Sequence, residues 1–108
     1  MSTTDLKKGS AEMLILALLD EEESHGYGLA QSIERRSGGA LKFYAASLYP
    51  VLYRLEQRGL IRGRWDDGAR RRRYYRLTPK GQRALRRERD RFATFIDAVQ
   101  RVAGIGNA

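Results

Sequence analysis

Four successive arginines, Arg70 to Arg73, form the longest run of positive charge in the sequence. Guanidinium groups bind phosphate oxygens in a bidentate geometry, and two aromatic residues, Tyr74 and Tyr75, follow directly. A basic and aromatic segment of this kind is typical of a surface that binds a nucleic-acid backbone. The alternative is a solvated, mobile loop, which runs of like charge usually form.

The positive charge is concentrated in the middle of the chain. The 108 residues carry 21 Lys and Arg against 13 Asp and Glu, which gives a formal net charge of +8. Residues 54–91 hold 15 basic and 5 acidic side chains, whereas residues 1–53 hold 5 and 7. A polyanionic partner is therefore expected to meet the middle segment.

The stretch 45–59, AASLYPVLYRLEQRG, precedes this segment and separates into two helical faces. At 100° per residue, the apolar face carries Leu48, Val51, Leu52 and Leu55. The opposite face and its flanks carry short polar, aromatic and cationic side chains, namely Ala46, Ser47, Tyr49, Pro50, Tyr53, Arg54 and Gln57. This pattern is typical either of an ordinary surface helix or of a helix that lies in a DNA major groove.

Other residue types that could do chemistry give little support for an enzyme. The chain has no cysteine and a single histidine, His25, which beside a helix start is typical of a capping or packing residue. Gly26-Tyr27-Gly28 lacks the strand and the third glycine of a dinucleotide-binding fingerprint. The acidic run 20–23 is expected to lie at the start of the next helix, where negative charge is favourable. We therefore expect no catalytic residue, no metal and no cofactor.

Hydrophobic runs in the chain are short. The longest, residues 13–19, has seven residues, far below the roughly 20 that cross a bilayer, and no signal-peptide pattern precedes it. We expect a cytoplasmic protein with no membrane partner.

The secondary-structure elements that position these residues are expected to be four helices and one hairpin. Residues 1–9 are predicted to be a flexible arm, with Ser10 as the N-cap of a helix that ends near Asp20. A second helix is expected from His25 or Gly26 to Arg36, with Tyr27, Leu29, Ala30 and Ile33 facing inward, before the stop at residues 37–39.

The second half of the chain is predicted to contain the hairpin and a long helix. Ile61 to Trp65 and Tyr74 to Leu77 are expected to pair as strands, joined by a turn at residues 66–68 and the arginine run. Thr78 is predicted to cap a final helix, with Pro79 at its first position, that extends to about Ala103.

Two helices carry apolar side chains that one small domain does not obviously cover. The first helix is apolar nearly all round, and the last repeats Leu85, Phe92 and Val99 at seven-residue spacing. A second copy of the chain is the expected cover, through Leu14, Leu18, Leu85, Phe92, Phe95, Ile96 and Val99. The alternative is a last helix that folds back on its own core.

These elements predict a mainly α fold with a small β-hairpin. Three helices followed by a basic hairpin are the order of a winged helix-turn-helix domain, in which the third helix enters the major groove and the hairpin, or wing, contacts backbone or minor groove. The predicted organisation is an arm at 1–9, a winged-helix DNA-binding domain at 10–78, and a dimerisation helix with its tail at 79–108.

Three segments carry a more specific signal: LILALLDEEESHGYGLA (14–30), SLYPVLYRLEQRGLI (47–61) and RRYYRLTPKG (72–81). Together they resemble the PadR family of bacterial transcriptional regulators, in its short form with a single C-terminal helix. The resemblance implies a homodimeric repressor that binds a near-palindromic operator on double-stranded DNA. It also implies release by a small aromatic or lipophilic effector near the dimer interface, where Phe92 and Phe95 are expected to line the cavity.

The resemblance also places individual residues on the DNA-facing motif and on the wing. Combined with the helical pattern, the predicted DNA-binding set is Tyr27, Lys42, Ala46, Ser47, Tyr49, Pro50, Tyr53, Arg54, Arg70, Arg71, Arg72, Arg73 and Tyr74. Gly28 departs from the family, since many members have an acidic residue there. Ala45-Ala46 likewise replaces the usual proline or glycine before the central helix.

The sequence therefore predicts a sequence-specific DNA-binding transcriptional regulator. Two other functions stay open, because a fold does not fix function. One is a winged-helix module that binds another protein, and the other is an architectural DNA binder that is indifferent to sequence.

Overall fold

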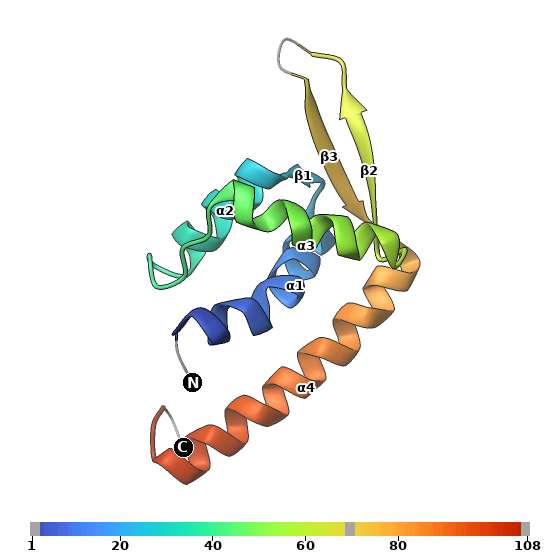
Figure 1. The fold of residues 1–108 in the computed structure, drawn as a ribbon. Helices are drawn as coiled ribbons and strands as arrows, with labels where there is room; N and C mark the ends of the chain where they lie inside the picture. The colour runs from blue at the N-terminus through green and yellow to red at the C-terminus, as the bar shows by residue number, and fades with distance from the viewer. Residues whose placement is uncertain (1–2, 69–70, 107–108) are drawn as a thin grey trace.

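The computed structural model describes the backbone of residues 3–68 and 71–106, and the side chains from residue 10 onward within those ranges. The helices α1 to α3 pack together, the hairpin of β2 and β3 rises from one side of them, and α4 leaves at the base of the hairpin (Figure 1). The order is α1 (Thr3–Glu21), β1 (Ser24–His25), α2 (Gly26–Arg36), α3 (Ala45–Gln57), β2 (Ile61–Asp66), β3 (Arg72–Leu77) and α4 (Pro79–Ala103). The predicted mainly α architecture with a hairpin wing is confirmed.

The first helix begins earlier than the sequence pattern predicted. It starts at Thr3, so Ser10 lies inside the helix and residues 3–9 are helical instead of forming a flexible arm. No proline interrupts this segment, and a glycine such as Gly9 inside a helix costs only about 1 kcal/mol relative to alanine. The apolar pattern that begins near Met13 marks where the helix becomes buried, which differs from where it starts.

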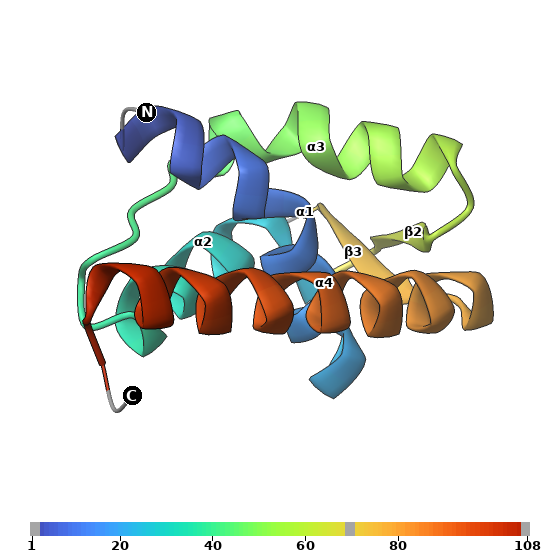
Figure 2. The ribbon, with the colours of Figure 1, turned by 90° about the horizontal axis from the view of Figure 1, so that it is seen from below.

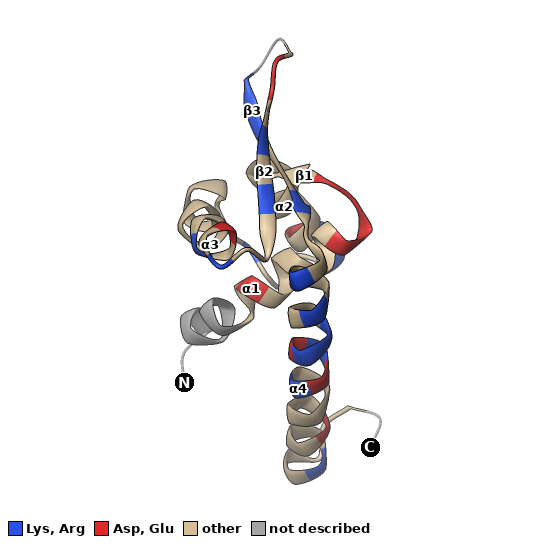
Figure 3. Ribbon diagram, turned by 90° about the vertical axis from the view of Figure 1, so that its right-hand side faces the viewer, with Lys and Arg blue, Asp and Glu red and all other residues tan. Residues whose placement is uncertain are grey.

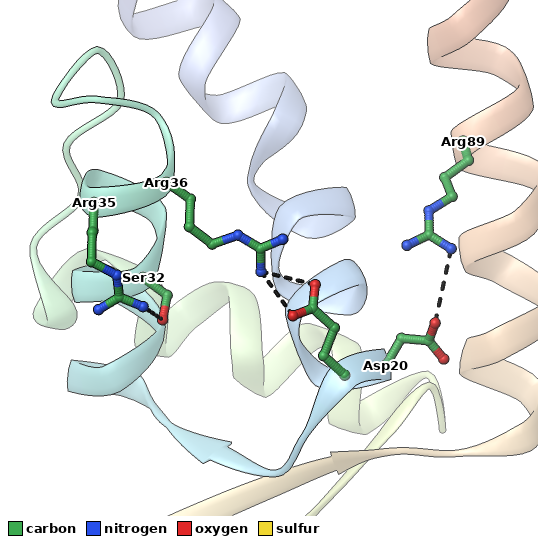
Figure 4. Close-up of polar contacts among 6 residues, drawn as sticks. Asp20, Ser32, Arg35, Arg36 and Arg89 are labelled. Carbon is green, nitrogen blue, oxygen red and sulfur yellow. Dashed lines mark hydrogen bonds and ion pairs between the residues drawn. The ribbon is translucent and has the colours of Figure 1, made fainter.

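The acidic run was predicted to start the second helix, and this was wrong. Asp20 and Glu21 belong to α1, and α2 has no acidic residue in its first turn. Glu21 pairs with Arg36 at 2.8 Å, which ties α1 to α2, and Asp20 lies 3.9 Å from Arg89 of α4 (Figure 4). These carboxylates therefore connect helices, and the α2 N-cap is His25, as the lone histidine suggested.

The central helix α3 has the predicted rotation. Leu48, Leu52 and Leu55 are fully buried, while the opposite face is exposed. Gly59, with a φ of 74°, ends the helix in a Schellman arrangement, because the Leu60 N–H donates to the Leu55 carbonyl at 3.0 Å. This tight stop turns the chain directly into β2.

Among the described residues, the sheet has three antiparallel strands in the order β1-β3-β2. The hairpin pairs Ile61 with Leu77 at its base and Asp66 with Arg72 at the end of the ladder nearest the tip. The two-residue strand β1 was not predicted, because Ser24-His25 is too short to show a periodic pattern. It sets His25 opposite Tyr74 and so fixes α2 to the base of the wing.

The last helix begins in the core and then projects away from it. Thr78 caps α4 by accepting from the Gly81 N–H at 3.0 Å, as predicted. Leu85 is 1% exposed and packs in the core of its own chain, so its assignment to the dimer seam was wrong. Seen from below, α4 is one straight helix (Figure 2), and the radius of gyration of 15.0 Å exceeds the roughly 13 Å of a compact domain of this length.

Within residues 3–68 and 71–106, no helix combines the length and the apolar character of a membrane span.

Candidate nucleic-acid interface

The outward face of α3 presents the side chains that the sequence placed there. Tyr49 and Tyr53 are each more than half exposed, because Leu48, Leu52 and Leu55 occupy the buried side of the same helix. Their exposed neighbours on this face are Ala46, Ser47, Pro50 and Arg54. Since the core holds the opposite side, these side chains are free to meet a partner without a change in the fold.

Tyr27 was expected to face inward, and the structure places it outward, 55% exposed. Gly26, Leu29, Ala30 and Ile33 are the buried residues of α2, and Tyr27 lies on the other side of the helix. The Tyr27 ring instead lies parallel to the His25 ring, with centroids 6.4 Å apart. This exposure is compatible with the place that the family resemblance gives Tyr27 on the DNA-facing motif.

The start of α2 touches the outward face of α3. A Cβ atom built on Gly26 would lie 3.2 Å from the Tyr49 ring, so the two helices meet closely there. At Gly28, which departs from the family pattern, a Cβ atom would lie 2.8 Å from Ser24 Oγ and 3.3 Å from the His25 ring. Glycine at this position thus leaves room for the His25 ring against the first turn of α2.

The arginines of the wing have different neighbours. Arg71 is exposed and lies over the Trp65 ring at 4.9 Å, and Arg72 Nη1 lies 2.9 Å from His25 Nε2. Arg73 donates to Glu56 of α3 at 2.7 Å and is only 28% exposed. Arg70 lies outside the described residues. Arg73 therefore attaches the wing to α3, and its contact with DNA, like those of the other three arginines, stays a prediction.

Glu56 is the acceptor that makes this attachment possible. Its carboxylate also accepts from the backbone N–H of Gly63 at 3.2 Å. A Cβ atom on Gly63 would lie 2.6 Å from Arg73 Nε, so the guanidinium passes directly over this glycine of β2. Sequence reasoning missed Glu56, because an ion pair between residues 17 positions apart leaves no local pattern.

Two further predicted contacts, Lys42 and Tyr74, have contrasting environments. Lys42 is exposed in the loop before α3, 6.0 Å from the Tyr44 ring. Tyr74 is half-buried, and its ring meets the His25 ring edge-on at 5.1 Å. Lys42 therefore remains accessible to a polyanion, whereas Tyr74 mainly packs at the base of the wing.

Trp65, the only tryptophan, was not predicted as part of this surface. It is half exposed on β2, directly opposite Arg73, and Arg71 and Arg73 both lie over its ring. A lone aromatic residue on the outer face of a basic strand was the available signal. Figure 3 shows Lys and Arg along the hairpin and on the half of α4 nearest to it, while the far half of α4 carries few charges.

Two ionisable groups at the base of the wing have shifted pKa values. Partial burial, and then the nearby Arg72 cation, lower the pKa of His25 below its ordinary value of 6.5. A hydrogen bond from Arg64 lowers the pKa of Glu23. Both shifts arise where β1 meets the hairpin.

Residues 15–87 match the sequence model of the transcriptional regulator PadR-like family. The chain belongs to this family. Accordingly, the exposed face of α3 and the basic wing are parts of a PadR-family winged-helix transcriptional regulator, and DNA is the partner that this family binds.

Several relatives and solved structures are similar over most of the chain. A transcriptional regulator of Mycobacterium tuberculosis is 36% identical and covers 79% of this chain and 78% of its own. The structure of a PadR family regulator from Eggerthella lenta is 33% identical, with a TM-score of 0.80 over 95% of this chain and 89% of that one. A transcriptional regulator from Clostridium thermocellum is 26% identical, with a TM-score of 0.84 over 94% and 97% of the two chains.

Proposed function

We propose that this PadR-family protein is a homodimeric repressor that reads a near-palindromic operator with α3 and contacts the adjacent DNA backbone with its wing. The observation that carries the proposal is the division of α3, whose Leu48, Leu52 and Leu55 are buried while the Tyr49 and Tyr53 face is exposed beside a basic hairpin. A helix held on one side by the core can enter a major groove on the other.

Dimerisation is supported by apolar surface that one protomer leaves uncovered. Phe95 is 56% and Val102 90% exposed on the projecting half of α4, with Ile96 and Val99 between them. The half-buried Leu14 and Leu18 also line a groove of about 210 Å³ between α1 and α2. A two-fold partner that covers these surfaces would set two α3 helices about 34 Å apart, one turn of DNA.

An effector is proposed to bind between the protomers, near Phe92 and Phe95. Phe92 is half-buried and Phe95 is exposed, so both present ring surface on the side where the partner would pack. The groove between α1 and α2 is smaller than the roughly 300–1,000 Å³ of most ligand pockets. A cavity completed by the partner would therefore be needed, and a ligand in it would change the spacing of the two α3 helices.

The operator test compares two neighbouring residues of α3. A footprint on the DNA upstream of the protein's own gene is expected to protect an inverted repeat with half-sites about one turn apart. Tyr53→Ala should keep the melting temperature and lower the preference for this site over random DNA, by about 1–3 kcal/mol for a base contact. Leu52→Ala should lose about 2–5 kcal/mol of unfolding free energy, because it leaves a cavity in the core.

The two alternative functions give different results in the same assay. An architectural DNA binder would bind the footprinted site and random DNA equally well, and Tyr53→Ala would not change that ratio. A protein-interaction module would bind neither duplex at low salt. Either result would contradict the operator-binding proposal.

A further inference from the structure

His25 lies at the junction of three parts of the interface. Its backbone pairs with Tyr74 in β3, its side chain caps α2, and Gly26, which follows it, packs against Tyr49 of α3. The ring is partly exposed and faces Arg72 across 2.9 Å. Neither the family pattern nor the helical periodicity assigns a DNA contact to this histidine.

The hydrogen bonds of His25 determine where its proton is. Nδ1 accepts from the Gly28 N–H at 3.1 Å, so the neutral ring must carry its proton on Nε2. Nε2 then is a donor, and the atom 2.9 Å from it, Arg72 Nη1, is also a donor. The other tautomer only moves the conflict to Gly28, whose N–H would then face Nδ1–H.

Two hydrogen-bond donors this close together are favourable only if one acceptor accepts a hydrogen bond from each of them. An anionic oxygen is the best acceptor for such a pair, because Arg72 carries a full positive charge and hydrogen bonds to charged groups are the strong ones. We propose that His25 Nε2–H and the Arg72 guanidinium together bind one phosphate of the DNA backbone, at the junction of α2 and the wing. This rests on the DNA-binding function of the family and adds a contact outside α3 and the wing tip.

The groups that surround the His25–Arg72 pair are compatible with an anion. Tyr27 of α2 and Tyr74 of β3 pack against the His25 ring. Arg64 of β2 lies over Tyr74 at 5.2 Å, and its charge is paired with Glu23. Among the described residues, Arg72 is thus the cation in contact with the ring that no carboxylate pairs. Partial burial, and then this cation, lower the pKa of His25 in the free protein.

The pair also has the right position for a backbone phosphate. Arg72 is the first residue of β3, the strand that leads from the wing tip. His25 precedes Gly26, which packs on Tyr49 at the face of α3 that would enter a major groove. A helix and a wing that contact successive grooves must cross the phosphate backbone between them. A phosphate-binding group fixed at this crossing would set the angle between the helix and the wing, and so the register of the protein on DNA.

The first test measures DNA affinity with a labelled duplex of random sequence, since phosphate contacts are independent of sequence. His25→Asn keeps a good N-cap for α2 but removes the donor to phosphate, and should raise the Kd about fivefold, the value of one hydrogen bond. Arg72→Gln should lower the slope of log Kd against log salt by about 0.9. The double variant should be little weaker than Arg72→Gln alone, because both residues bind one group.

Arg91→Gln is the matched control, because Arg91 is an exposed arginine on α4, away from the junction. It should leave the salt slope unchanged. The proposal is overturned if Arg72→Gln also keeps the slope of the unmodified protein, or if folded His25→Asn binds as tightly as the unmodified protein. If the unmodified protein itself binds no duplex at low salt, the DNA-binding function fails together with this contact.

The second test uses the fact that His25 is the only histidine, so its ring resonances in an NMR spectrum need no assignment. Adding the duplex should raise the pKa of His25, and DNA binding should tighten as the pH falls from about 8 to 6, by at most about tenfold per pH unit for one proton. An unchanged pKa would overturn the proposal. An equal rise with inorganic phosphate alone, at millimolar concentration, would assign the pair to a free anion and overturn the DNA contact.

Discussion

Neighbouring arginines in the wing have different roles because successive strand residues point to opposite faces. Arg72 faces His25 and the start of α2, whereas Arg73 faces Glu56 and the Trp65 ring. Arg71, beside the tip, stays exposed. The three described arginines of the run therefore differ: Arg71 is exposed, Arg72 contacts the cap of α2, and Arg73 attaches the wing to α3.

Arg73→Ala is expected to destabilise the fold. It removes the partner of the half-buried Glu56 and leaves that carboxylate with fewer donors, at a cost of about 1–2 kcal/mol in unfolding free energy. Arg71→Ala, which removes an exposed side chain of the same type, should change stability by less than about 0.5 kcal/mol. Urea titration of both variants makes the comparison, and equal midpoints would contradict the structural role of Arg73.

His25 is expected to make the free protein less stable in mild acid. Its pKa is lowered in the folded state, so between that value and the ordinary 6.5 the unfolded chain binds more protons than the folded one. Its stabilising contribution is therefore complete above about pH 6.5 and is lost as the pH falls. Thermal melts between about pH 5 and 7.5 should show this slope, and His25→Asn should flatten it.

The pH range of these melts must exclude the range in which carboxylates titrate. The pKa of Glu23 is also lowered, so its contribution is present above 4.5 and is lost as the pH falls further. Restricting the melts to the range above about pH 5 separates the two groups. A slope that persists in His25→Asn within this range would show that His25 is not its source.

At the scale of whole elements, the start of α4 is held unusually close to the end of α3. The Thr78 backbone N–H donates to the Leu60 carbonyl at 3.1 Å, and Thr78 Oγ1 donates to the Gly59 carbonyl at 2.7 Å and accepts from the Gly81 N–H. These bonds hold the first turn of α4 against Leu60. A Cβ atom on Gly81 would lie 2.0 Å from the Leu60 carbonyl oxygen and 2.6 Å from the Leu77 side chain. The direction in which α4 leaves the body thus depends on a glycine in its first turn.

Gly81→Ala is accordingly expected to destabilise the protein, although alanine is the better helix former by about 1 kcal/mol. The new methyl group would have to displace backbone, and overpacking of this kind costs about 1–3 kcal/mol. Gln82→Ala, at the exposed neighbouring position, should stay within about 0.5 kcal/mol of the unmodified protein. A higher melting temperature for Gly81→Ala would show that α4 is not held in this contact.

At the scale of the whole molecule, the helical body carries two projections, the β2–β3 hairpin on one side and α4 on the other (Figure 1). The principal extents are 51 × 28 × 22 Å, and the long dimension runs from the hairpin to the far end of α4. Basic residues gather on the half of α4 near the wing, and the apolar Phe95 and Val99 lie on the far half. DNA binding and self-association are thereby expected at opposite ends of the molecule.

Phe95→Asp tests the proposed association. A carboxylate on the apolar side of α4 would be buried without a partner in the dimer, so the variant should sediment as a monomer and lose tight binding to a palindromic site. Thr94→Asp places the same charge one residue away, off the apolar stripe, and should remain dimeric. If Phe95→Asp also sediments as a dimer, α4 is not the dimer interface.

The sequence alone determined the elements whose signals are local. The rotation of α3 followed from the spacing of Leu48, Leu52 and Leu55, and the start of α4 followed from Thr78 and Pro79, because periodicity and capping act within a few residues. The family resemblance rested on the same local motifs.

Only the tertiary structure decided which residues meet across long separations. In the structure, Leu85 packs in the core of its own chain and Tyr27 faces outward. Arg73 pairs with Glu56, and His25 lies in contact with Arg72. A heptad position looks the same in sequence whether its own chain or a partner covers it, and an arginine looks the same whether it is paired or exposed. Those outcomes depend on how α1, β1 and the hairpin pack together, which no local pattern encodes.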